Sequence, residues 1–377
     1  MKPPIVIVTD SLSRRRGGAE IYLANLAGFL VQNGHPIHAL VRRDNADFFM
    51  PGVTVETLRA DGSGLRGEKK FIRAVQRRLR GDEPIVLSTI AMPGITHYQP
   101  HMGLHRHGFR ASRNSRNSVF FRSVHALASQ FNLKRRWLVQ MQEQLLTRTA
   151  TTKIMVFSRL VQSQILDAYP VAPANITIAP LGVDLERFHP ADTPRQPAPE
   201  KLKLLFTAHN FRLKGLHCLL AALDRALKNG LQAELCIVGN DSRRPAFEKL
   251  AARLGLTAQV RFLGLVDVPD AAALYRSCDV LVHPTFTDHC SLVVLEALAS
   301  GMPVITTRQN GATEFIESGK SGIIIDHPRN IPALADAMVR LQDRQNLAAI
   351  SVAAAALRSR LDFNQHAQQV LAWLTTR

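Results

Sequence analysis

Short apolar runs alternate with amphipathic stretches along nearly the whole chain. In the first half, we expect strands at residues 5–8, 37–41, 53–58, 85–88, 154–157 and 176–179. Helices are expected there at residues 19–33, 69–80 and 159–169, and Gly34 suits a left-handed cap after the first of them. Strands that alternate with helices in this way are typical of parallel sheets covered by helices.

The second half repeats the pattern. Strands are expected at residues 203–208, 233–238, 260–263, 280–283, 304–307 and 323–326. Helices are expected at residues 215–228, 246–254 and 292–299, and at 345–361 and 363–376 near the end of the chain. Between the halves, residues 189–200 include four prolines. Such a stretch cannot continue a helix or a central strand, so we interpret it as a connection between domains.

These patterns, with a length of 377 residues, predict an α/β chain of two Rossmann-like domains. We place the N-terminal domain at residues 1–185 and the C-terminal domain at 186–360. A last helix at 361–377 would pack back on the N-terminal domain. The basic region at 106–148 is the least regular part, and there we expect a mobile loop up to about residue 119 and helix beyond it.

Positive charge is concentrated in the first half. Lys and Arg exceed Asp and Glu by 14 before Pro180 and by 3 after it, and the 59 positions between Glu83 and Glu143 hold no acidic residue. A field of one sign attracts an anionic partner, such as an acidic membrane surface or a phosphorylated lipid-linked acceptor. A solvated basic surface is the plainer alternative. Nucleic acid is a further one, but no zinc-finger, recognition-helix or aromatic RNP-like pattern accompanies the charge.

The composition, with 46% hydrophobic and 20% charged residues, is that of a soluble globular protein. No apolar run approaches the roughly 18 residues of a membrane span, and the first residues lack the features of a secretory signal. We therefore expect a cytoplasmic protein. Its four cysteines have neither zinc-ligand nor Cys-x-x-Cys spacing, so we expect reduced and mostly buried thiols.

Three loops after predicted strands carry candidate chemistry. Gly17 and Gly18 open the first helix, where backbone N–H groups can approach an anion. Arg212 and Lys214 follow the strand at 203–208, and cations at the carboxyl end of a parallel strand can neutralise a diphosphate. Asp288 precedes the helix at 292–299 and Glu296 lies inside it, at a separation of up to roughly 12 Å, which matches the span of a nucleotide sugar's diphosphate. The N–H groups of Ser291, Leu292 and Val293 would hold its phosphates.

Several of these motifs resemble those of one enzyme family. The stretch from Asp288 through Glu296 to Ile305 is similar to the acid-x7-acid signature of retaining family-4 glycosyltransferases of the GT-B fold. Gly17-Gly18-Ala19-Glu20 resembles that family's N-terminal glycine motif, and residues 181–190 resemble its domain junction. Lys214-Gly215 resembles its phosphate-binding lysine, and residues 310–314 with Ser321-Gly322 its C-terminal loops. The resemblance covers almost the whole chain.

The resemblance implies two parallel sheets that face each other across a cleft, with the acceptor bound by the N-terminal domain and a nucleotide sugar by the C-terminal one. A hexose, most simply glucose from UDP-glucose, would be transferred with retention. Asp288, where the family more often has Glu, would hold the sugar, and Glu296 the ribose. Lys214 and Arg212 would stabilise the leaving diphosphate. His209 stands where the family often has Arg, and for this reason we nominate Arg212. His101 would lie near the donor sugar and acceptor.

The acceptor implied by the charge and the resemblance is an anionic, membrane-associated glycolipid, because the sequence is similar to lipopolysaccharide-core glycosyltransferases. The protein would bind peripherally to the cytoplasmic face of the inner membrane. The residues assigned to acceptor or membrane contact are His105, Arg110, Arg113, Arg116, Lys134, Arg135 and Arg136.

We expect no cofactor beyond the UDP-sugar co-substrate, and no metal. His97, His101, His105 and His107 are close in sequence, but their spacing fits a loop and no carboxylate is nearby. The alternatives are a nucleotide-sugar epimerase or phosphorylase, a transferase for another polysaccharide, and a basic nucleic-acid-binding protein.

Overall fold

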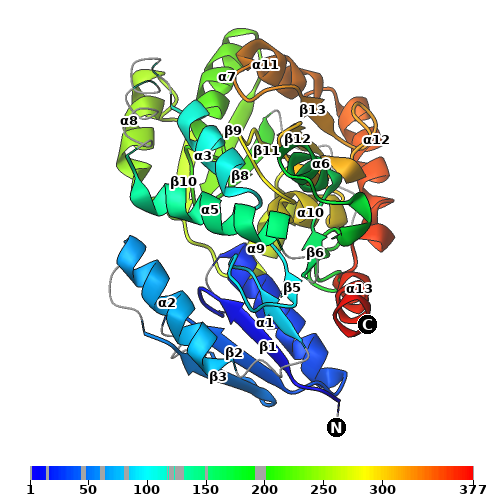
Figure 1. The fold of residues 1–377 in the computed structure, drawn as a ribbon. Helices are drawn as coiled ribbons and strands as arrows, with labels where there is room; N and C mark the ends of the chain where they lie inside the picture. The colour runs from blue at the N-terminus through cyan, green and yellow to red at the C-terminus, as the bar shows by residue number, and fades with distance from the viewer. Residues whose placement is uncertain are drawn as a thin grey trace. The chain divides into compact units, whose positions relative to one another are not determined.

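The computed structural model describes residues 2–13, 17–43, 48–59, 64–79, 85–116, 118, 123, 131–148, 152–191 and 201–376. The chain folds into two compact units. The first contains residues 1–113, 118–180 and 364–377, and the second contains 114–117 and 181–363. The chain thus enters the second unit after Pro180 and returns to the first after Phe363 (Figure 1).

The first unit is built on a parallel sheet. Its described strands are β1 (Ile5–Thr9), β2 (Ile37–Val41), β3 (Val53–Thr57), β4 (Val86–Ser88), β5 (His97–Tyr98), β6 (Lys153–Val156) and β7 (Ile176–Ile178). They are arranged in the order β3-β2-β1-β4-β5-β6-β7. All five residues of β1 are buried, as expected for a strand covered on both faces.

Helices of the first unit cover this sheet. They are α1 (Gly18–Gln32), α2 (Leu65–Arg78), α3 (His105–Asn114), α5 (Leu133–Arg148) and α6 (Arg159–Ala168), with a short 3-10 turn, η1 (Pro173–Asn175). Phe71 and Val75 of α2 share a buried apolar cluster with Val6 and Val8 of β1. Gly34 has a φ of 83°, so the predicted left-handed cap after α1 is confirmed.

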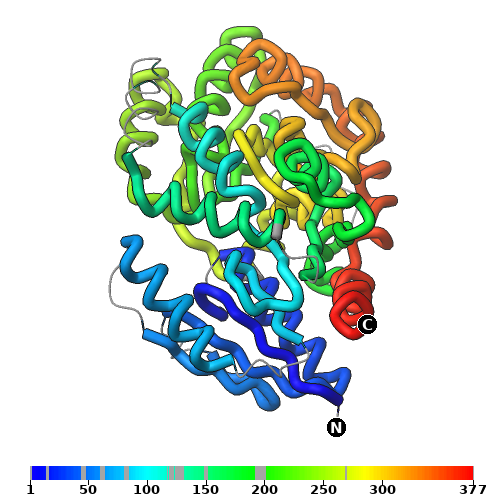
Figure 2. The backbone as a smooth tube through the Cα atoms, viewed as in Figure 1, coloured from blue at the N-terminus to red at the C-terminus, as the bar shows by residue number. Residues whose placement is uncertain are grey.

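The C-terminal helix α13 (Phe363–Thr375) belongs to the first unit. His366 of α13 contacts the Tyr22 hydroxyl of α1, with 3.0 Å between Nε2 and Oη. The Trp373 ring meets His97 of β5 edge to face, with 4.7 Å between centroids. Lys153 of β6 donates a hydrogen bond to the Thr376 carbonyl. In Figure 2 the red end of the tube accordingly lies beside the green segment that includes β6.

The second unit has its own parallel sheet. Its described strands are β8 (Leu202–Thr207), β9 (Ala233–Val238), β10 (Val260–Gly264), β11 (Val280–His283), β12 (Val304–Thr307) and β13 (Ile323–Ile325). Their order is β10-β9-β8-β11-β12-β13. From β8 the chain adds β9 and β10 on one side of that strand, and it then adds β11, β12 and β13 on the other side. The carboxyl ends of β8 and β11 therefore form a topological switch point, where ligands of such folds bind.

Helices of the second unit are α7 (Leu216–Lys228), α8 (Arg244–Arg253), α9 (Val268–Ser277), α10 (Leu292–Ala299), α11 (Ile331–Arg340) and α12 (Arg344–Ala355). Two 3-10 segments, η2 (Gly311–Phe315) and η3 (Arg358–Leu361), complete it. Leu219 and Leu223 of α7 are fully buried in a cluster with Phe206 of β8. The expected helix at 345–361 is thus a helix that ends at Ala355, followed by η3.

The prediction of a loop before residue 119 is wrong, because residues 105–114 form α3. This helix buries only Ala111, so it lacks the apolar stripe that reveals most helices in a sequence. Its first N–H, from His105, instead donates a hydrogen bond of 2.8 Å to the side-chain amide oxygen Oε1 of Gln142 on α5. The expected helix start at 119 lies outside the described residues.

Candidate active site

Two loops of the second unit meet at the switch point. Residues 208–215 join β8 to α7, and residues 284–291 join β11 to α10. Gly215 has a φ of 83°, and a Cβ built on it would lie 2.0 Å from the Pro284 carbonyl oxygen. The Leu213 carbonyl accepts a hydrogen bond from the Phe286 N–H at 2.9 Å. Because position 215 has no side chain, the first loop can pack directly against the second.

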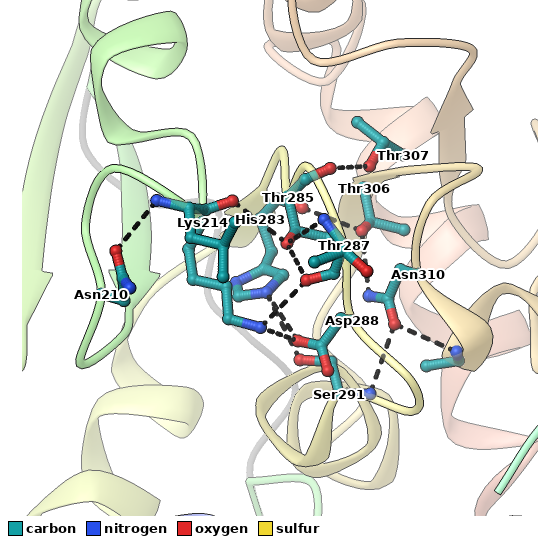
Figure 3. Close-up of polar contacts among 12 residues, drawn as sticks. Asn210, Lys214, His283, Thr285, Thr287, Asp288, Ser291, Thr306, Thr307 and Asn310 are labelled. Atoms are coloured by element: carbon teal, nitrogen blue, oxygen red, sulfur yellow. Dashed lines mark hydrogen bonds and ion pairs between the residues drawn. The ribbon is translucent and has the colours of Figure 1, made fainter. Parts of the chain in front are cut away.

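This packing brings Lys214 to Asp288. The Lys214 Nζ lies 2.5 Å from the Asp288 Oδ2 and 3.4 Å from the Thr287 carbonyl oxygen (Figure 3). His283, the last residue of β11, has its Nε2 3.4 Å from the same Oδ2 and 3.4 Å from the Ser291 Oγ. These contacts of the Asp288 side chain all involve Oδ2, and within the described residues Oδ1 takes part in no hydrogen bond or ion pair.

The charge on Asp288 is stabilised by this arrangement. Burial raises the pKa of its carboxyl, but the Lys214 ammonium and the hydrogen bond from His283 outweigh burial and hold that pKa well below its usual range. Burial also lowers the pKa of His283. Asp288 is therefore a carboxylate paired with a lysine ammonium, beside a neutral imidazole.

The N-terminus of α10 faces the same loops. Asn310, which is fully buried, accepts hydrogen bonds on Oδ1 from the N–H groups of Ser291 at 3.3 Å and Ala312 at 3.1 Å (Figure 3). The Ser291 N–H that we assigned to the donor phosphates is thus already engaged by a side chain. Leu292 and Val293 begin the helix, so their N–H groups have no intrahelical partner and keep the positive end of the helix dipole.

Glu296 lies one turn further along α10. Its Oε2 accepts a hydrogen bond of 2.7 Å from the Tyr275 hydroxyl of α9. Burial raises the pKa of Glu296 to about 7, although this hydrogen bond and the charge of Arg187 lower it. Glu296 is half-buried rather than an ordinary surface residue. Near neutral pH it can therefore both donate and accept hydrogen bonds.

Arg212 lies in the same loop as Lys214 and is half-buried. The pKa of His217 on α7 is lowered to about 4, mainly by burial and by the charge of Arg329. The charge of Arg212 is a smaller cause of the same shift. The structure thus places the Arg212 charge near the start of α7, whereas the charged partner of Asp288 is Lys214. Its predicted role at the diphosphate stays a prediction.

In the first unit, Gly17 caps α1 and Gly18 is its first residue. A Cβ at Gly17 would lie 2.9 Å from the Glu20 Oε2, and the Ser11 hydroxyl donates to the Glu20 Oε1 at 3.4 Å. The glycine thus allows the Glu20 carboxylate to fold back over the helix start. Residues 14–16, the arginines before this turn, lie outside the described residues. The donor-binding roles of Gly17 and Gly18 stay predictions.

His101 follows β5 in the first unit. Its Nε2 lies 2.9 Å from the Gln99 Oε1, and its ring packs against Tyr22 and Phe157 with centroids 5.3 and 5.2 Å apart. Gln99 also contacts the Tyr22 hydroxyl. His101 is half-buried in an aromatic cluster of the first unit, and its role at the reacting centre stays a prediction.

The basic residues assigned to acceptor or membrane contact have different environments. Lys134 lies 2.8 Å from the Glu68 Oε1 and ties α5 to α2, a structural contact that the sequence did not reveal. Arg135 lies over the Phe109 ring, with 4.8 Å from Cζ to the centroid, and His105 stacks on that ring at 5.9 Å. Of the other residues assigned to acceptor or membrane contact, Arg110 and Arg136 are exposed, and Arg113 and Arg116 are half-buried.

The histidine group is not a loop. His97 lies in β5 and His105 and His107 in α3, so the loop interpretation holds for His101 alone. Within the described residues, no group of three or more His, Cys, Asp or Glu side chains could hold a metal ion. None of the helices in the described part of the chain is long and apolar enough to cross a membrane. The four cysteines are free, and Cys218, Cys278 and Cys290 are buried.

The two units match two family models. Residues 16–187 match the model described as Glycosyltransferase Family 4, and residues 190–357 match the model described as Glycosyl transferases group 1. The chain belongs to the family-4 glycosyltransferases of the GT-B fold. The predicted family and fold are thereby confirmed.

Curated glycosyltransferases are similar to this chain over part of their sequences. A D-inositol 3-phosphate glycosyltransferase from Arthrobacter sp. (strain FB24) is 33% identical over 184 residues, 46% of this chain and 44% of that protein. One from Catenulispora acidiphila is 31% identical over 201 residues, 48% of this chain and 47% of that protein. The match thus spans less than half the length of these curated relatives.

Among solved structures, WaaG, a glycosyltransferase involved in lipopolysaccharide biosynthesis, has a TM-score of 0.81 at 19% identity, over 99% of this chain and 100% of that one. HepE from Anabaena, solved in complex with UDP and glucose, has a TM-score of 0.73 at 19% identity, over 99% of both chains. At these identities the likeness shows the fold.

The sequence assigned no role to three residues of this glycosyltransferase's candidate site. Asn310 lies in the stretch 310–314 that resembles a family loop, but its contact with the start of α10 was not predicted. His283 ends a strand at the ligand-binding edge, so its position in the pattern could have indicated it. Tyr275 gave no signal, because it stands 21 residues before Glu296 and reaches it only through the packing of α9.

The contact at Gly215 predicts a large loss of stability for Gly215→Ala. Gly255 provides the matched control, since it also has a positive φ, 74°, but no atom within 4 Å of a built Cβ. Gly255→Ala should therefore cost only the left-handed strain, about 1–2 kcal/mol. Gly215→Ala should cost at least about 2 kcal/mol more in urea unfolding, because the methyl group displaces the loop. Equal losses for the two variants would refute the steric account.

The raised pKa of Glu296 predicts a pH-dependent stability. Between about pH 4.3, the usual glutamate pKa, and about pH 7, the folded protein retains a proton that the unfolded chain has released. The free energy of unfolding should therefore fall as the pH rises through this range. Glu296→Gln should remove this fall, as measured by melting temperature from pH 4.5 to 8. Glu317→Gln, at an exposed site, should leave the profile of the unaltered protein, whereas parallel profiles for all three proteins would contradict the assignment.

Proposed function

We propose that this protein is a retaining glycosyltransferase that moves a hexose such as glucose from a UDP-sugar to an anionic, membrane-associated glycolipid such as the lipopolysaccharide core. The observation that carries the proposal is the edge of the second unit's sheet. That edge carries the Lys214 ammonium and the N-terminus of α10, and Glu296 lies one turn into the same helix. These groups suit the diphosphate and ribose of a nucleotide sugar.

The donor half of the proposal gains support from the solved relatives. HepE from Anabaena was solved in complex with UDP-glucose, and it shares the fold over 99% of this chain. In the present protein, Lys214 and the N–H groups of Leu292 and Val293 would bind the diphosphate. Glu296, held by Tyr275, would accept hydrogen bonds from ribose hydroxyls. The Oδ1 of Asp288 would accept one from the hexose while Oδ2 keeps its contact with Lys214.

The chemistry proposed for these residues is electrostatic. The bond between the anomeric carbon and the phosphate oxygen breaks while the acceptor oxygen bonds to that carbon on the same face. The departing phosphate oxygen takes the acceptor's proton. Lys214 and the dipole of α10 stabilise the negative charge that develops on the diphosphate, and Arg212 adds a second positive charge. The proposal includes no metal, because these groups supply the positive charge.

Two acceptor chemistries have support. WaaG, which shares the fold, is involved in lipopolysaccharide biosynthesis, and the acid-free basic stretch of the first unit favours a comparable anionic glycolipid at the cytoplasmic face of the inner membrane. The curated relatives act, by their names, on D-inositol 3-phosphate, which favours a phosphorylated polyol. Both acceptors carry negative charge beside hydroxyl groups.

A thermal-shift titration with UDP, GDP, ADP and their sugars tests the donor assignment. A ligand present at 100 times its Kd stabilises the native state by roughly 2.7 kcal/mol, so UDP and UDP-glucose should raise the melting temperature by several degrees. Glu296→Ala should abolish the shift. Glu296→Gln should weaken it while preserving the fold, and Glu317→Ala is the exposed control.

Other outcomes of the same titration would contradict the proposal. Stabilisation by GDP or ADP but not UDP would overturn the donor, and no shift with any nucleotide would overturn a nucleotide-sugar enzyme. Product formed from the UDP-sugar without an acceptor would indicate an epimerase or phosphorylase. Tight retention of an oligonucleotide with no response to UDP-sugars would indicate a nucleic-acid-binding protein.

A further inference from the structure

The first unit contains a cavity of about 530 Å³ between α3 and α5. Arg106 and Phe109 of α3 line one side. The other side is formed by residues of α5, which are Arg135, Arg136, Val139, Gln140 and Glu143. This volume lies within the range of small-molecule sites, roughly 300–1,000 Å³. All its lining residues belong to the first unit, whereas Lys214 and Asp288 belong to the second.

The two walls are fixed by buried contacts. Gln142, which is 1% exposed, donates hydrogen bonds to the Tyr98 hydroxyl at 2.8 Å and to the Gly103 carbonyl at 2.9 Å. Its amide oxygen accepts one from the His105 N–H, the first of α3, at 2.8 Å. At the other end of α5, the Lys134 ammonium lies 2.8 Å from the buried Glu68 carboxylate. The cavity is therefore held between two anchored helices.

The cavity lining contains three guanidinium groups, those of Arg106, Arg135 and Arg136, and one carboxylate, that of Glu143. Arg135 is held over the Phe109 ring, 4.8 Å from its centroid, and His105 also stacks on that ring. Arg106 and Arg136 are exposed, and within the described residues their guanidinium groups make no hydrogen bond or ion pair. Arginine forks match the geometry of phosphate oxygens, so the cavity favours a phosphate.

The remaining polar groups point to more than a bare phosphate. The Glu143 carboxylate repels an anion, but with the Gln140 amide it can accept hydrogen bonds from hydroxyl groups. A ligand with a phosphate on a ring of hydroxyls offers a partner to the arginines and to these acceptor groups alike. We propose that the cavity between α3 and α5 binds a phosphorylated sugar or polyol, and that this group is the part of the acceptor by which it is recognised.

The assignment to the acceptor rests on the proposed function, whereas binding itself does not. Calorimetry with glucose 6-phosphate, glucose and inorganic phosphate tests the cavity directly, and UDP is titrated into the same proteins. Glucose 6-phosphate should bind more tightly than either other probe. Arg136→Gln should weaken it at least tenfold and leave UDP unchanged, because an arginine fork to phosphate is lost. Arg73→Gln removes an exposed charge of α2 and should change neither affinity.

Vesicles distinguish a lipid-linked source from a free one. Phosphatidylcholine vesicles with phosphatidylinositol 4-phosphate carry a phosphorylated ring, and vesicles with an equal charge of phosphatidylglycerol do not. Preference for the first, lost in Arg136→Gln, would support a lipid-linked acceptor. Binding of soluble glucose 6-phosphate without this preference would support the cavity with a free ligand.

Two results would overturn the proposal. One is binding of UDP without any binding of glucose 6-phosphate. The other is an equal effect of Arg136→Gln and Arg73→Gln on both vesicle types, which would mean a general basic surface. If UDP fails to bind while glucose 6-phosphate binds in an Arg136-dependent way, the donor assignment fails and the cavity stands.

Discussion

One carboxylate, that of Asp288, organises the candidate active site. Its Oδ2 lies 2.5 Å from the Lys214 ammonium and 3.4 Å from the His283 ring, so it links the loop after β8 to the loop after β11. A lysine ammonium half-buried without a partner would be costly, and a carboxylate without one equally so. Because each partner stabilises the charged form of the other, the protein can keep a lysine ammonium at the ligand-binding edge of its sheet.

Backbone geometry makes this ion pair possible. Gly215 lets the first loop pack against the Pro284 carbonyl, and Asn310 fixes the start of α10 by accepting hydrogen bonds from Ser291 and Ala312. The first unit uses a comparable device, in which Gln142 holds the start of α3 against α5. In both units a buried amide side chain positions a helix that carries the proposed binding groups.

The sequence predicted the parallel sheets, nearly all strand positions and the family, because apolar runs and glycine-rich loops are local signals. It failed for α3, which is stabilised by Gln142 and not by an apolar stripe of its own. It identified Lys214, Asp288 and Glu296 but not their partners. His283 ends a strand at the ligand-binding edge, so its position could have indicated it. Tyr275 reaches Glu296 through tertiary packing, and the contact of Lys134 with Glu68 joins residues 66 positions apart, so no spacing pattern reveals these two.

Calorimetric titration of UDP and of uridine into the unaltered protein and Lys214→Met tests most directly the claim that Lys214 binds a diphosphate. Uridine shares the base and ribose of UDP but has no phosphate. Loss of a charge-assisted hydrogen bond should weaken UDP binding roughly 10- to 100-fold and leave uridine binding unchanged. Unchanged UDP binding, or an equal loss for both ligands, would contradict the account.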